Sequence, residues 1–125
     1  MTGNLYAAWI GFLLGALAGA TAGLFFDREA WLGGYAGWHR RMVRLGHISF
    51  FGIGLLNLGF FLTVEALGIQ GGLRLPAYLL IVGAVTMPLV CYLSAFRKGF
   101  RHLFFVPAGA VTLALAVFTW VLVVG

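Results

Sequence analysis

Three histidines are the residues best suited to carry chemistry in this chain of 125 residues. His47 follows Arg44 and precedes a long apolar run, and His102 directly follows Arg101 at the start of another apolar run. If both runs are helices that start from the same side of a membrane, the two imidazoles lie at similar depth. Two imidazoles at one depth can be the axial ligands of a b-type haem, and nearby arginines can meet its propionates.

Glycine near His47 fits the same interpretation. Gly54 lies about two helical turns beyond His47 and close to the same face, where a missing side chain would make room for a porphyrin. The sequence therefore predicts His47 and His102 as metal ligands, with Arg44, Arg101 and Gly54 as further haem contacts. Two alternatives stay open: interfacial histidines often only bind water or lipid phosphate, and they can also hold another metal or relay protons. His39 is a weaker candidate ligand.

The segment around His47, RLGHISFFGIGLLNLGFFLT, resembles a known haem-binding helix. In subunit-I-type proteins of the haem–copper oxidase group, the haem-ligating helix has a histidine that precedes a glycine-containing apolar run. The resemblance covers only residues 44–63 and implies an axial haem ligand at His47 alone. That family has many more helices and builds its copper–haem centre from several further histidines. The resemblance therefore does not imply oxygen chemistry for this chain.

Composition indicates which elements position these histidines. Apolar residues make up 62% of the chain, charged residues 9%, and the mean hydropathy is +1.04, so too few polar residues are present to cover a soluble domain. Four apolar runs, each long enough to cross ~30 Å of hydrocarbon and without period-2 alternation, predict helices at about 5–26, 45–67, 76–96 and 103–124. The expected fold is all-α: one domain, 1–125, that forms an integral membrane four-helix bundle.

The basic residues predict the orientation of this bundle. All but Arg74 fall in the connections between runs 1 and 2 and between runs 3 and 4: Arg28, Arg40, Arg41, Arg44, Arg97, Lys98 and Arg101. By the positive-inside rule these two connections are cytoplasmic, and both termini lie on the non-cytoplasmic side. Trp31, Tyr35 and Trp38 fit an aromatic belt at the same interface. The expected location is the inner membrane of a bacterium.

Polar and small residues within the runs predict how the helices pack. Gly11, Gly15, Gly19 and Gly23 recur every four residues and form a stripe on one face, where another backbone can approach closely. We expect this glycine stripe to pack within the bundle, against a second copy in a homo-oligomer, or against another subunit of a membrane complex. Asn57 is expected to make hydrogen bonds between helices.

The types and positions of the charged residues exclude several classes of function. Only Asp27, Glu29 and Glu65 are acidic, and no nucleotide-binding loop, zinc signature or Ser-His-Asp arrangement can be assembled, which argues against a self-sufficient enzyme. The basic residues flank apolar runs, so the net charge of +5 points to the lipid bilayer and not to nucleic acid. Three hypotheses remain: a bis-histidine haem b bundle for electron transfer, a non-catalytic accessory or assembly subunit, and a small oligomeric transporter.

Overall fold

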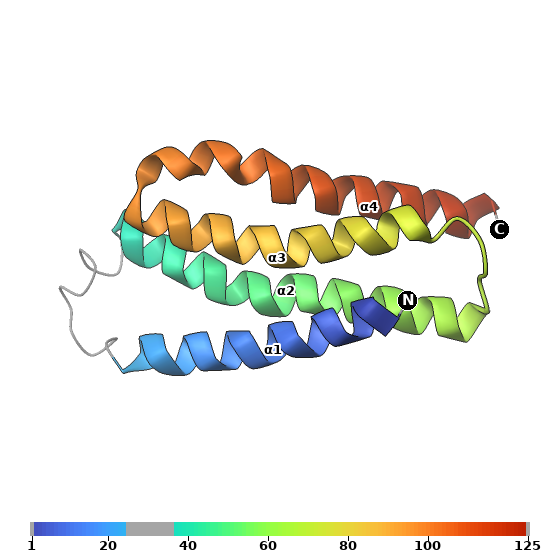
Figure 1. Ribbon diagram of the computed structural model, residues 1–125, viewed down its shortest axis with the longest axis horizontal. Coiled ribbons are helices and arrows are strands. Elements are labelled where there is room, and N and C mark those ends of the chain that lie inside the picture. The colour runs from blue at the N-terminus through green and yellow to red at the C-terminus, as the bar shows by residue number, and fades with distance from the viewer. Residues whose placement is uncertain (1, 25–36, 125) are drawn as a thin grey trace.

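The chain folds into four long α-helices, α1 (Thr2–Gly23), α2 (Trp38–Leu67), α3 (Arg74–Phe96) and α4 (Phe105–Val124) (Figure 1). These bounds come from a computed structural model, which describes residues 2–24 and 37–124. A short 3-10 helix, η2 (Lys98–Phe104), joins α3 to α4. Each of the four α-helices is part of a helical segment long and apolar enough to cross a membrane. The prediction of an all-α integral membrane four-helix bundle is therefore confirmed.

The helices pack in the order in which they occur along the chain. α1 packs on α2, α2 on α3 and α3 on α4, and α1 also touches α3 (Figure 1). Within the described residues no backbone contact joins α1 to α4. These two helices therefore lie on opposite sides of the central α2–α3 pair, and each leaves much of its surface open to the membrane.

Some helix ends differ from the predicted ones, because a helix can continue beyond the apolar run into charged residues. α2 begins at Trp38, seven residues before the predicted position 45, and so includes the polar segment from His39 to Arg44. Hydropathy locates the part of a helix that lies in hydrocarbon, whereas these basic residues are good helix formers that extend the helix beyond it. The fourth run starts as η2, and α4 proper begins at Phe105, two residues before Pro107. Pro107 therefore lies in the first turn, where its missing N–H is tolerated.

The turn between α2 and α3 depends on two glycines with left-handed backbone. Gly68 ends α2 at φ 63°, ψ 31° and donates its N–H to the Val64 carbonyl, which also accepts the Ile69 N–H at 3.3 Å. Gly72 has φ 73° shortly before α3 begins. Side chains with a Cβ rarely adopt such angles, so glycine at both positions lets this connection reverse direction within six residues.

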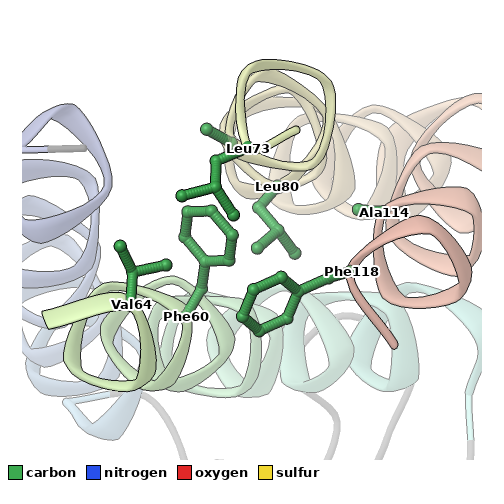
Figure 2. Packing of buried hydrophobic residues seen from close by; sticks show 7 residues of the cluster. Phe60, Val64, Leu73, Leu80, Ala114 and Phe118 are labelled. Carbon is green, nitrogen blue, oxygen red and sulfur yellow. The ribbon is translucent and has the colours of Figure 1, made fainter. Parts of the chain in front are cut away.

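Two apolar clusters hold the helices together, one toward each end of the bundle. Near the α2–α3 turn, Phe60, Val64, Leu73, Leu80, Ala114 and Phe118 pack between α2, α3 and α4 (Figure 2). The rings of Phe60 and Phe118 meet edge to face at 4.7 Å between centroids, which links α2 to α4. At the other end, the smaller residues Ala22, Met42, Val43 and Ala95 join α1, α2 and α3.

The described basic residues other than Arg74 gather at one end of the bundle, which we call the basic end. It consists of the start of α2, the end of α3 and η2, and Figure 1 shows these segments together. Arg28, Trp31 and Tyr35 also belong to the predicted cytoplasmic interface but lie outside the described residues. The side of the membrane that the basic end faces remains a prediction.

The topology can be tested with reporter fusions. A reporter that is active only in the periplasm should be inactive when inserted within Arg97–Arg101 and active when fused after Gly125, because the seven-to-one asymmetry of basic residues predicts a cytoplasmic basic end. A cytoplasmic reporter at the same two positions should give the opposite pattern. Periplasmic activity within Arg97–Arg101 would show that the predicted orientation is wrong.

Candidate functional site

At the basic end, the first residues of α2 bind the last carbonyls of α3. The Trp38 indole N–H donates to the Ser94 carbonyl at 2.6 Å, and His39 Nδ1 lies against the Ala95 carbonyl at short range. The last carbonyls of a helix have no partner within that helix, so these bonds satisfy groups that would otherwise be unpaired. Lys98 Nζ lies 5.1 Å from the centre of the Trp38 ring and adds a cation–π contact. Trp38 and His39 therefore fasten α2 to α3.

His47 lies half-buried between α1 and α2. A Cβ placed on Gly19 would lie 2.5 Å from His47 Nε2, so the imidazole fills the space above that glycine. The ring also meets Phe51 edge to face, with 5.4 Å between centroids. The Nε2 atom of His47 thus faces the backbone of α1.

His102 lies in a different environment. It is exposed on η2 and lines a surface pocket together with Arg97 and Phe100. η2 packs on α3 and α4, and in the part of the chain that the structure describes it makes no backbone contact with α2. The structure therefore places the two predicted ligands beside different helices and does not bring them into one site.

The other predicted haem contacts also lie apart. A Cβ on Gly54 would lie 2.8 Å from the Phe12 ring, so a side chain of α1 occupies the space predicted for a porphyrin. Arg44 is half-buried on α2, whereas Arg101 is exposed on η2 and donates to the Lys98 carbonyl at 3.0 Å. Among residues 2–24 and 37–124, no three His, Cys, Asp or Glu side chains form a group suited to a metal ion. Haem binding remains a prediction, and the contacts of His47 and Gly54 are those of packing residues.

The glycine stripe of α1 faces α2. A Cβ on Gly11 would lie 3.2 Å from the Phe50 carbonyl oxygen, and one on Gly15 would lie 2.7 Å from the Phe51 ring and 3.0 Å from Phe50 Cβ. The predicted close helix contact is thus confirmed for Gly11, Gly15 and Gly19, within the chain itself. Gly23 has no such neighbour within 4 Å in the part of the chain that the structure describes. Assembly with another chain through the stripe remains a prediction, and three of its four glycines already face α2.

A buried pair of asparagines joins three helices. Asn4 Nδ2 donates to Asn57 Oδ1 at 2.7 Å and to the Ala77 carbonyl at 3.1 Å, and Asn57 Nδ2 donates to the carbonyls of Ile53 and Leu80. The role predicted for Asn57 is confirmed. The sequence analysis did not single out Asn4, although it lies seven residues before Gly11 and so on the same face as the glycine stripe. That register was the signal that could have identified it.

An apolar groove runs between α1 and α3, with α2 as its floor; we call it the α1–α3 groove. Its volume is about 560 Å³. Small residues line much of both walls and the floor includes an aromatic ring: Gly3, Ala7 and Gly11 on α1, Ala84 and Pro88 on α3, and Phe50 below. Large apolar side chains on its rims, Leu14, Val85 and Leu89, are exposed, so the groove is open to the membrane. The sequence analysis missed it because it depends on how far apart α1 and α3 lie.

Comparisons of the chain with family sequence profiles, with curated proteins and with solved structures found no match.

Proposed function

We propose that the chain is a non-catalytic subunit that binds one transmembrane helix of another membrane protein in the α1–α3 groove. The groove is the observation that carries this proposal, because it is an apolar hollow that lies open on the membrane-facing surface of the described residues. In a membrane, helices associate through close packing, and small residues at the contact let two backbones approach each other. Gly3, Ala7 and Gly11 recur every four residues along one wall and provide such a surface.

The rims of the groove supply the rest of the contact. Leu14 is 44% exposed, Val85 63% and Leu89 52%, so these side chains can close around the sides of an inserted helix. Lipid tails are as apolar as leucine, so the gain comes from the better packing of a fitted helix compared with mobile acyl chains. Small residues on the walls and large residues on the rims together form a hollow that can receive a ridge of side chains on a partner helix.

A partner of different sequence fits the groove better than a second copy of this chain. A twofold dimer places the same surface of both copies at the interface, and two concave grooves facing each other would leave a void. A second copy could instead insert α4, but that contact joins two different surfaces and extends into a ring or filament. One helix of a different protein can fill the groove without leaving a further contact surface open, so the assembly stops at one partner.

The test is photo-crosslinking from inside the groove. A photoreactive residue at Ala7 or Ala84, both half-buried groove residues, should give an adduct of one discrete mass. Mass spectrometry should identify the same transmembrane segment of the same second protein from both positions. Ala116 is the matched control, because it is exposed on α4 away from the groove and should not give this adduct. Filling the groove with Ala84→Trp should remove the adduct formed from Ala7.

Other outcomes would contradict the proposal. Adducts of twice the chain mass from Ala7 and Ala84 would show that a second copy occupies the groove. Adducts with phospholipid only would show that the groove is an ordinary lipid-covered surface. An equal yield of the protein adduct from Ala116 would show that contact is not specific to the groove.

Absorption spectroscopy separates this proposal from the haem hypothesis. The protein purified from cells with ample haem should be colourless if it is a packing subunit. A low-spin haem spectrum would instead support electron transfer, provided that His47→Ala and His102→Ala each abolish it. His39→Ala should leave that spectrum intact, since His39 is bonded to the end of α3.

A further inference from the structure

We propose that the basic end binds the headgroup of an anionic phospholipid in a pocket on η2. This η2 pocket has a volume of about 380 Å³ and is lined by Arg97, Gly99, Phe100, His102 and Leu103. It combines a permanent cation, a histidine and apolar side chains at the end of two membrane-spanning helices. The proposal is independent of the helix-binding groove, which lies between α1 and α3.

The break between α3 and η2 forms the pocket. Arg97 leaves the helix with extended backbone, φ −135° and ψ 108°, while its N–H still donates to the Leu93 carbonyl at 2.8 Å. The chain then turns at once, because the Phe100 N–H donates to the Arg97 carbonyl at 3.0 Å. No atom of residues 2–24 and 37–124 lies within 4 Å of a Cβ placed on Gly99, so this part of the chain leaves space beside it. This turn brings Arg97 and His102, five residues apart, to the same pocket.

The cationic groups of the pocket are available for a ligand. Within residues 2–24 and 37–124, the Arg97 guanidinium and the His102 ring have no hydrogen-bond or ion-pair partner. Glu65, the one acidic residue in those ranges, lies near the opposite end of α2; Asp27 and Glu29 belong to the connection outside them. A guanidinium can donate two parallel hydrogen bonds to phosphate, which makes arginine well suited to recognise it.

The apolar side chains of the pocket favour a lipid over free phosphate. Leu103 and Phe100 line it, and Phe96 and Phe105, which flank the pocket residues in the chain, are 69% and 72% exposed. Inorganic phosphate gains nothing from such neighbours, whereas the glycerol and upper acyl carbons of a phospholipid pack against them. Basic pockets at the ends of transmembrane helices on the cytoplasmic side are typical sites for anionic headgroups, and the η2 pocket lies in the connection between two such helices.

A specific site can be distinguished from the general attraction of a basic surface. Any positive charge supports membrane topology, but only residues that line the pocket should matter for a bound headgroup. Lys98 is the matched control, because it follows Arg97 in the chain yet lies over the Trp38 ring and does not line the pocket. Arg74, at the far end of the bundle, is a second control.

The experiment is native mass spectrometry of the purified full-length chain, titrated with phosphatidylglycerol or phosphatidylcholine of identical acyl chains. We expect the wild-type protein to prefer phosphatidylglycerol and to retain it in the presence of excess inorganic phosphate. Arg97→Gln should weaken phosphatidylglycerol binding about fivefold, because the guanidinium in the pocket loses its charge-assisted hydrogen bonds to the phosphate, and His102→Gln should weaken it as well. Lys98→Gln and Arg74→Gln should each change binding less than about twofold.

Each other outcome overturns the proposal. Equal binding of the two lipids by the wild-type protein would show that the pocket has no headgroup specificity, whatever the variants do. An equal loss from Lys98→Gln and Arg97→Gln would show a diffuse basic surface without a site. Displacement of the lipid by inorganic phosphate would identify a free-phosphate site. If Arg97→Gln fails to fold, Arg97→Lys is the second variant. Lysine keeps the positive charge but cannot donate the two parallel hydrogen bonds to the phosphate. Wild-type affinity of Arg97→Lys for phosphatidylglycerol would therefore also contradict the proposal.

Discussion

Gly15→Leu should destabilise the bundle by about 3 kcal/mol, or prevent its folding, the upper range for overpacking a closely packed contact. Even a Cβ at this position would lie 3.0 Å from Phe50 Cβ, an atom that is attached directly to the α2 backbone and cannot rotate away. The Phe51 ring, 2.7 Å from the same Cβ, could turn aside, but Phe50 Cβ could not. The two helices must therefore separate, and the neighbouring contacts at Gly11 and Gly19 are lost with them.

The matched control is Gly23→Leu, on the same helix and in the same four-residue repeat. Among the described residues no atom lies within 4 Å of a Cβ there, so the same substitution should change stability by less than about 0.5 kcal/mol. Thermal unfolding of both variants in one detergent, with size-exclusion chromatography to verify the folded fraction, measures the difference. If Gly15→Leu and Gly23→Leu are equally stable, the glycine stripe does not form the contact between α1 and α2.

Asn57→Leu is expected to cost about 1–3 kcal/mol, since it leaves buried partners without their hydrogen bonds. The Asn4 amide loses its acceptor on α2, and the Leu80 carbonyl on α3 loses its donor. Denaturant unfolding in detergent measures the loss. Thr63→Val is a suitable control on the same helix, because the exposed Thr63 hydroxyl bonds only within α2, to the Gly59 carbonyl.

A double-mutant cycle then isolates the bond between the two asparagines. Asn4→Leu and Asn57→Leu should together cost less than the sum of their separate effects, by roughly 1 kcal/mol, because the second substitution finds its partner already removed. Coupling energies of this kind within membranes average about 0.6 and reach about 1.7 kcal/mol. Strictly additive losses would show that each amide bonds to backbone alone and that the two side chains do not interact.

The sequence predicted features that belong to a single helix, and it did not predict features that depend on which helices become neighbours. Hydropathy was enough to locate four spans, and the repeat of glycines was enough to identify a packing face. Matched depth of His47 and His102 does not determine whether the two side chains share a site, so their joint ligation of a haem stays a prediction. His47 points at α1, while His102 belongs to η2 beside α3 and α4, and no periodicity encodes which helices become neighbours.

The α1–α3 groove and the η2 pocket show a second limit. The groove is a space between helices distant in sequence, and its size follows from how far apart they lie. The η2 pocket forms within residues 97–103 and follows from the backbone break at Arg97. Asn4 is a different case, because its register with the glycine stripe could have been read from the sequence. A polar residue on a predicted packing face indicates a partner on the facing helix.

The order of packing has a consequence for how the chain is made. Its main helix contacts join helices that follow one another along the chain, with α1 against α3 the one further backbone contact among the described residues. A helix that leaves the ribosome therefore finds its principal neighbour already synthesised, and no helix pair must wait for a distant segment. The bundle can thus assemble in the bilayer step by step during translation, with α4 added last to a three-helix core already joined by Asn4 and Asn57.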